Sequence, residues 1–115
     1  MIAAPVVAPP AQVLSLNDMI EQKATEMGVD SALAQDIAFC ESTSRQFARD
    51  GDVLRGKKNP NDLGLFQINQ KYHLEKSREL GFDIRTTEGN IDYAMWLLKH
   101  EGSRHWRSSK NCWLG

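Results

Sequence analysis

Apolar residues recur at the spacing of an α-helix in several stretches of this chain. The first stretch predicts a helix over about residues 16–27, which Ser15 and Asp18 cap and which Gly28 ends. Its apolar face is formed by Leu16, Met19, Ile20 and Met27. This spacing of apolar residues is typical of an amphipathic helix with one buried side.

A second helix is predicted after Asp30, because aspartate is a preferred N-cap residue. This helix ends within residues 41–44, and its buried positions are Leu33, Ile37 and Cys40. The polar segment that follows, residues 45–62, contains two glycines and a proline. We therefore predict a long loop after the second helix.

The second half of the chain combines one irregular segment with further helices. Residues 62–69, DLGLFQIN, are apolar but interrupted by Gly64, which predicts a turn or a small hairpin. Helices are predicted over about residues 74–80 and 88–101, each followed by a glycine, and residues 105–115 form a tail with two tryptophans. Almost no segment has the pattern of a long strand. The fold class is therefore mainly α, a compact helical domain with at most a small β-hairpin.

The first residues have a different character from the rest of the chain. Three of the four prolines lie among the first ten residues, where they remove amide donors and prevent a regular helix. We interpret residues 1–14 as a Pro-rich leader or linker and residues 15–115 as one domain. The leader is apolar like a secretion signal but lacks the basic residues that begin one.

Composition narrows the possible functions. The chain has 115 residues, enough for one domain with a real core, and its 41% hydrophobic and 25% charged residues are ordinary for a globular protein. Fourteen basic against fifteen acidic residues give a net charge of −1, which argues against a general nucleic-acid binder. No apolar stretch of about 18 residues is present, so we expect no membrane span.

Glu41 is the acidic residue with the most distinctive position. It directly follows the apolar face of the second predicted helix, so its carboxyl group would lie at the edge of the core. Desolvation there would raise its pKa, as general acid catalysis near neutral pH requires. The alternative is a glutamate at a helix end that turns into solvent, and position alone favours this alternative.

The histidines and cysteines do not form a metal-binding pattern. In HEGSRH the two histidines are five residues apart, with a glycine between them, whereas the HExxH zinc motif needs a spacing of four on one helix. Cys40 and Cys112 are too few for a zinc site and lack CxxC spacing. We expect no metal and no cofactor. From spacing alone, the two cysteines either form one disulfide or remain unlinked thiols.

Three segments, in this order, resemble a known family: Glu41 with Ser42, GLFQIN at residues 64–69, and NIDYAMWLL at residues 90–98. They are similar to the three leading motifs of the lysozyme-like superfamily, most closely those of the soluble lytic transglycosylases. The resemblance covers about residues 30–113. It implies an α+β lysozyme-like fold and an enzyme that cleaves the β-1,4 bond between N-acetylmuramic acid and N-acetylglucosamine.

The resemblance also assigns roles to individual residues. Glu41 would be the catalytic acid, and Ser42 would orient a sugar or peptide near it. The other assigned positions are Gly64 and Leu65 as cleft backbone, Gln67 and Asn69 as amides that bind N-acetyl sugars, and Asn90 as support of the cleft floor. Tyr93 and Trp96 belong either to the site or to the core. The segment at residues 105–113 resembles the end of small members of the family, which implies a disulfide between Cys112 and Cys40.

The chain departs from the transglycosylase pattern at two points. No Tyr-Asn-x-Gly motif, whose tyrosine contacts the catalytic acid in that family, follows Leu98. In addition, DLGLFQIN resembles the segment of animal-type lysozymes in which the aspartate, here Asp62, is the second carboxylate. Asp62 is therefore either a second catalytic group or an aspartate that forms a turn.

The resemblance implies a lytic transglycosylase that gives 1,6-anhydromuramic products. The alternatives are a hydrolytic lysozyme that uses Asp62, a non-catalytic glycan-binding domain, and a helical interaction module without a sugar site. The partner that the resemblance implies is the peptidoglycan glycan strand. We expect a monomer that acts outside the cytoplasm, in the periplasm, in the cell wall or as a secreted protein.

Overall fold

The computed structural model describes residues 14–115, so almost all of the predicted leader lies outside the described residues. The described part is mainly helical with one small antiparallel sheet, which confirms the predicted fold class. The helices are α1 (Leu16–Met27), α2 (Ser31–Ser42), α3 (Gln70–Glu79), α4 (Thr87–Glu101), the 3-10 helix η1 (Arg104–Ser109) and α5 (Lys110–Trp113). The strands are β1 (Asp62–Leu63) and β2 (Ile68–Asn69).

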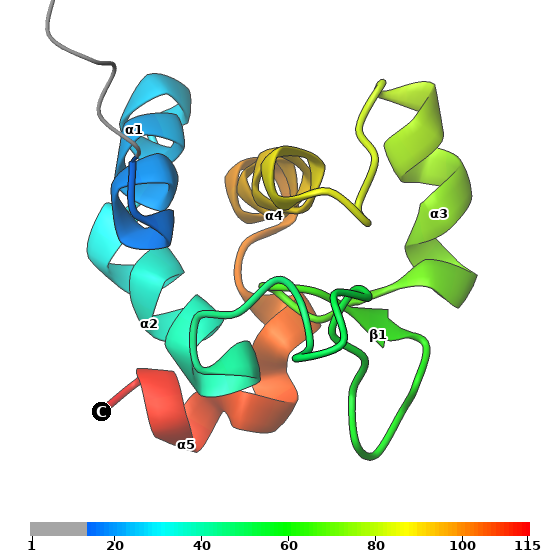
Figure 1. Ribbon diagram of the computed structural model, residues 1–115. Helices are drawn as coiled ribbons and strands as arrows, with labels where there is room; N and C mark the ends of the chain where they lie inside the picture. The colour runs from blue at the N-terminus through cyan, green and yellow to red at the C-terminus, as the bar shows by residue number, and fades with distance from the viewer. Residues whose placement is uncertain (1–13) are drawn as a thin grey trace, which may run out of the picture.

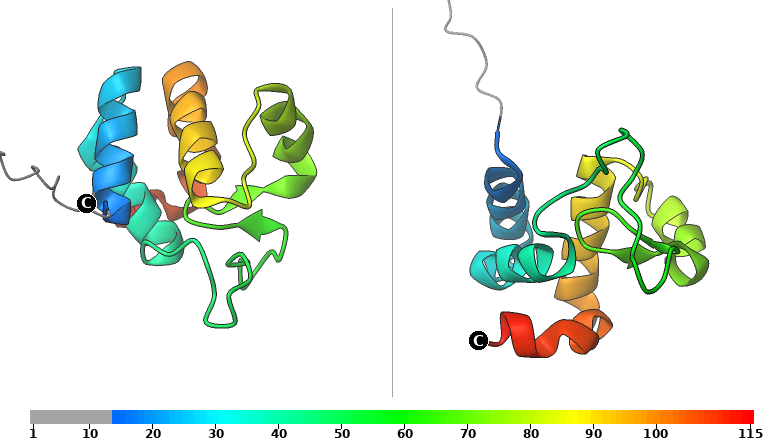
Figure 2. Two further views of the ribbon diagram at one scale, coloured as in Figure 1. Left: turned by 45° about the horizontal axis from the view of Figure 1, so that its top comes forward. Right: turned by 60° about the horizontal axis from the view of Figure 1, so that its bottom comes forward.

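Helix α4 occupies the centre of the molecule, with α1 and α2 on one side and α3 on the other (Figure 1). Its buried residues include Ile91 and Met95, and Leu98 is only 9% exposed. The small sheet lies below α4 in this view, and the loop between α2 and β1 projects away from the helices (Figure 2). One hydrophobic core therefore joins the helices to the hairpin.

The first two helices have the boundaries that the sequence predicts. The Ser15 hydroxyl accepts a hydrogen bond from the Asp18 amide, and the Asp30 carboxylate accepts one from the Leu33 amide. Helix α1 is followed by Gly28 in the left-handed conformation, with φ of 71°. Local capping chemistry thus determines where these helices begin and end.

The predicted start of one helix and the predicted form of the C-terminal segment were wrong. Helix α3 begins at Gln70, four residues before the predicted start, because the Asn69 side chain accepts hydrogen bonds from the amides of Lys71 and Tyr72 and caps the helix. The C-terminal segment is not an irregular tail: it forms η1 and α5. Trp106 anchors this segment, since its ring is buried and its indole N–H donates to the Phe66 carbonyl at 2.8 Å.

Strands β1 and β2 form the predicted small hairpin, in which Asp62 pairs with Asn69 and Leu63 with Ile68. Gly64 opens the connecting loop with φ of 75°, and a Cβ atom at this position would lie 2.5 Å from the Gln46 side chain. Glycine is thus required both for the turn and for the close approach of Gln46.

Cys40 and Cys112 form a disulfide, with Cα atoms 6.0 Å apart and a sequence separation of 72 residues. This pairing was implied by the family resemblance and is confirmed. It ties the last turn of α2 to α5, two elements that also pack together.

Reduction of this disulfide is expected to lower the free energy of unfolding by roughly 4 kcal/mol, because the closed loop is long and restricts the unfolded chain. Urea unfolding with and without reductant measures the change. The Cys40→Ser, Cys112→Ser double variant is the control, since its unfolding midpoint should not respond to reductant. An oxidised protein that unfolds at the same midpoint as the reduced protein would contradict this expectation.

No helix within residues 14–115 combines the length and the apolar character needed to cross a membrane.

Candidate active site

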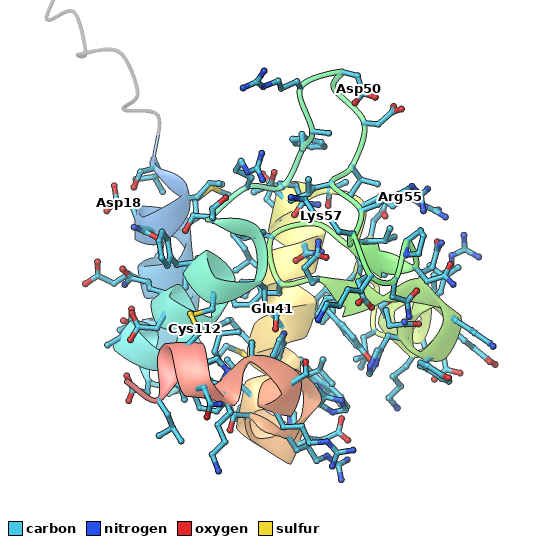
Figure 3. The ribbon with its side chains drawn as sticks, turned by 90° about the horizontal axis from the view of Figure 1, so that it is seen from below. Asp18, Glu41, Asp50, Arg55, Lys57 and Cys112 are labelled. Carbon is cyan, nitrogen blue, oxygen red and sulfur yellow. A yellow bond between two sulfur atoms is a disulfide. The ribbon has the colours of Figure 1, made fainter. Side chains whose placement is uncertain are left out.

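Glu41 lies in the last turn of α2 and is half-buried at the point where α2, the hairpin and the C-terminal segment meet (Figure 3). The Ser109 hydroxyl lies 2.7 Å from Glu41 Oε1 and donates a hydrogen bond to it. Burial raises the pKa of the Glu41 carboxyl, the Ser109 hydrogen bond opposes this rise, and the negative charge of Asp62 adds to it. The carboxyl group is therefore neither fully buried in the core nor turned into open solvent, and it holds a proton more firmly than an ordinary glutamate.

Asp62 lines the same narrow cavity as Glu41, from the first position of β1. Its Oδ1 accepts a hydrogen bond of 3.0 Å from the side-chain amide of Asn69, its partner across the hairpin. The hairpin register therefore fixes one oxygen of Asp62 and brings a second carboxylate close enough to influence Glu41.

Three adjoining cavities form one groove across this face of the molecule. The narrow middle part, about 90 Å³, contains Glu41 and Asp62. A cavity of about 550 Å³ opens on one side beneath the long loop, and one of about 490 Å³ opens on the other side between α3 and η1. Ser108 lines all three cavities. The carboxylates thus lie in the narrow middle part of a groove that continues in both directions. Such a shape can bind a polymer on both sides of the two carboxylates.

Basic side chains line both outer parts of the groove. Arg45, Arg55, Lys57 and Lys58 line the cavity beneath the long loop, and Arg104 and Arg107 line the cavity near α3. Arg55 and Lys57 belong to the long loop and line the same cavity as Glu41 (Figure 3). The groove therefore combines an acidic centre with basic ends, although the net charge of the chain is close to zero.

Gln67 and Asn69 line the groove beside the two carboxylates. Gln67 has φ of 51°, an uncommon conformation for a residue other than glycine, and its side-chain amide donates to the Gly64 carbonyl at 2.9 Å. This hydrogen bond holds the Gln67 backbone in place and leaves the side-chain carbonyl as an acceptor. The sequence motif thus brings Glu41, Asp62 and two amide side chains together.

The remaining predicted site residues are buried and support the hairpin from behind. The Ser42 hydroxyl donates to the Leu65 carbonyl at 2.7 Å, so it joins α2 to the hairpin. The Asn90 side chain is fully buried, accepts from the Phe66 amide and donates to the Leu63 carbonyl, both at 2.9 Å. These contacts fix the backbone of the loop between the strands. Gly64 and Leu65, predicted as cleft backbone, are buried in this loop and line none of the three cavities, whereas Gln67 at its end lines two of them.

Gln46 is a supporting residue that the sequence motifs do not indicate. Its side chain is 2% exposed, accepts from the Leu65 amide at 2.8 Å and donates to the carbonyls of Ile84 and Arg85. A glutamine at the start of a polar loop reads as solvent-exposed, so nothing in the pattern could have identified it.

His73 and Tyr93 form a second polar pair next to the carboxylates. His73 lines the narrow cavity, and its Nδ1 lies 2.8 Å from the hydroxyl of Tyr93, which is 1% exposed. Burial raises the pKa of Tyr93 to about 12 and lowers the pKa of His73. The lowered pKa favours the neutral imidazole, and the direction of its hydrogen bond with the Tyr93 hydroxyl follows the tautomer of the ring. Trp96 stacks on the Tyr93 ring within the helical core.

No protein-family model, curated protein or solved structure matches this chain. Within residues 14–115, no group of three or more histidine, cysteine, aspartate or glutamate side chains could hold a metal ion.

Proposed function

We propose that the protein cleaves the β-1,4 bond between N-acetylmuramic acid and N-acetylglucosamine in peptidoglycan, by lytic transglycosylation. The observation that carries this proposal is the position of the Glu41 carboxyl group. Its pKa is raised, and it lies in the narrow middle part of a groove that continues on both sides. Such a groove accommodates sugars on both sides of the bond that the acid protonates.

The reaction needs one carboxyl group used twice. Protonated Glu41 gives its proton to the glycosidic oxygen, and the bond to C1 of the muramic sugar breaks through an oxocarbenium-like transition state. Glu41, now a carboxylate, removes the proton from the C6 hydroxyl of the same sugar. The C6 oxygen attacks C1 and forms the 1,6-anhydro ring, and the proton taken from the C6 hydroxyl leaves Glu41 protonated again.

The amide side chains of the groove suit the N-acetyl groups of this substrate. Gln67 keeps its side-chain carbonyl as an acceptor, and Asn69 keeps one N–H beyond the one given to Asp62. His73 lines the same cavity and adds a ring nitrogen to these groups. The Cys40–Cys112 disulfide fits a location outside the cytoplasm, where peptidoglycan is exposed.

A second candidate reaction is hydrolysis with retention, and one observation favours it. Asp62 shares the narrow cavity with Glu41, so it could stabilise or attack C1 while water completes the reaction. The two reactions use the same substrate and the same acid but differ in their products.

The proposed function is tested with purified peptidoglycan sacculi. We expect the protein to release soluble muropeptides, which liquid chromatography and mass spectrometry detect. Binding of N-acetylglucosamine oligomers in an NMR titration without release of fragments would indicate a non-catalytic glycan-binding domain. Absence of both binding and release would indicate an interaction module and overturn the proposal.

A further inference from the structure

Ser109 is the only described residue whose side chain hydrogen-bonds to the Glu41 carboxyl group within residues 14–115. It belongs to the last position of η1 and is 68 residues away from Glu41 in sequence. The hydroxyl engages Oε1, whereas Oε2 has no hydrogen-bond partner among the described residues. One oxygen of the carboxyl group is therefore fixed, and the other remains open for a substrate atom.

The Ser109 hydroxyl is itself held in position by the C-terminal segment. The Trp113 indole N–H lies 3.1 Å from Ser109 Oγ and 3.2 Å from the Trp106 carbonyl, and it donates to both acceptors. The Ser109 hydroxyl has a second possible acceptor, the Trp106 carbonyl at 3.0 Å. Because a hydroxyl has a single proton, it donates either to Glu41 or to Trp106, and an ionised Glu41 is the stronger acceptor.

The disulfide links the residues next to Glu41 and next to Trp113. Cys40 immediately precedes Glu41, and Cys112 immediately precedes Trp113. Cys112 lies against the end of α2 close to Glu41 (Figure 3). A covalent link between α2 and α5 thus keeps the two helical segments that carry Glu41 and Ser109 next to each other.

We propose that Ser109 is the positioning residue of Glu41, and that the disulfide-linked segment of Trp113 keeps it in place. Ser109 fixes the rotation of the carboxyl group so that Oε2 faces the groove. It also stabilises the carboxylate that remains after the acid has given up its proton. The catalytic consequence of this role rests on the proposed function, whereas the hydrogen bond and its effect on Glu41 do not.

Several other titratable groups line the cavities around Glu41 and bear on any test by pH. Asp62 comes from β1, His73 from α3 and His105 from η1. Arg45, Arg55, Lys57 and Lys58 line the adjoining cavity. These groups are unchanged in the Ser109 variants, so a difference between variants reports on the hydroxyl itself.

The proposal is tested by NMR titration of the Glu41 carboxyl carbon in isotopically labelled protein. The Ser109 hydroxyl favours the ionised form of the carboxyl group, so Ser109→Ala should raise the pKa of Glu41 above that of the wild type. Ser109→Thr retains a hydroxyl and should restore most of the change. Ser103→Ala is the matched control, since Ser103 lies at the other end of η1 and makes no side-chain hydrogen bond to the helix start.

Activity on sacculi provides the second measurement. Ser109→Ala should lower kcat about tenfold with little change in KM, because a misdirected acid binds substrate as before but transfers its proton less often. The alkaline limb of the pH profile should move to higher pH together with the pKa of Glu41. An unchanged pKa in folded Ser109→Ala protein would overturn the proposal. A raised pKa without any activity in the wild type would retain the hydrogen-bond role and refute only the proposed function.

Discussion

Glu41→Gln is expected to abolish nearly all release of muropeptides while the fold and glycan binding remain. The amide has the shape of the carboxyl group and can still accept the Ser109 hydrogen bond, but it cannot deliver a proton to the glycosidic oxygen. General acid catalysis contributes about a hundredfold to ten-thousandfold, so the loss of activity should be at least of this order. Muropeptide release measured over a time course gives its size.

The control for this experiment is Glu21→Gln, which makes the same chemical change at an exposed position of α1. Its activity and melting temperature should equal those of the wild type. Binding of N-acetylglucosamine oligomers should survive in Glu41→Gln. Turnover like that of the wild type in a stably folded Glu41→Gln protein would show that Glu41 is only a helix-end residue.

The sequence predicts the parts of this fold that local chemistry determines. The ends of α1 and α2 follow from side chains that cap them within three residues, such as Ser15 and Asp30. The hairpin follows from Gly64, where the loop requires a left-handed residue. The early start of α3 could also have been predicted, because Asn69 is a good N-cap, but the motif assigned this residue to the hairpin alone.

The parts that could not be predicted depend on contacts between distant segments. Gln46 reaches backbone carbonyls 38 and 39 residues away, and Ser109 reaches Glu41 across 68 residues. The polarity of these side chains gives no indication of their partners. The helical form of residues 104–113 likewise depends on the buried Trp106 ring and on the disulfide, not on a periodic apolar pattern.

In the candidate site, too, some features follow from local sequence and others from contacts between distant segments. Its acid, its second carboxylate and its amides follow from two short motifs, and the structure brings Glu41, Asp62 and Gln67 to one narrow cavity. The position of Glu41 in the sequence alone favours a side chain that faces solvent. Its half-buried position results from the C-terminal segment, which covers α2 and supplies Ser109. Long-range packing thus creates the environment that raises the pKa of the acid.

The type of reaction is tested by combining Asp62→Asn with analysis of the products. If Glu41 acts alone, the wild-type products carry 1,6-anhydro ends and are lighter than hydrolysed products by one water. We expect such products, and we expect Asp62→Asn to retain activity within about tenfold of the wild type, since the side-chain amide oxygen can still accept from Asn69. Mass spectrometry of the muropeptides and rates of release measure both effects.

The pH profile of Asp62→Asn adds an independent measurement. The negative charge of Asp62 raises the pKa of Glu41, so its removal should lower that pKa and move the alkaline limb of activity to lower pH. Asp36→Asn, an exposed change on α2, is the control and should leave the profile unchanged. If Asp62 is instead the second carboxylate, the products should have reducing ends only and Asp62→Asn should lose activity by orders of magnitude, because the positive charge at C1 would lose its nearest stabilising group. That pair of results in a folded protein would replace transglycosylation with the lysozyme reaction.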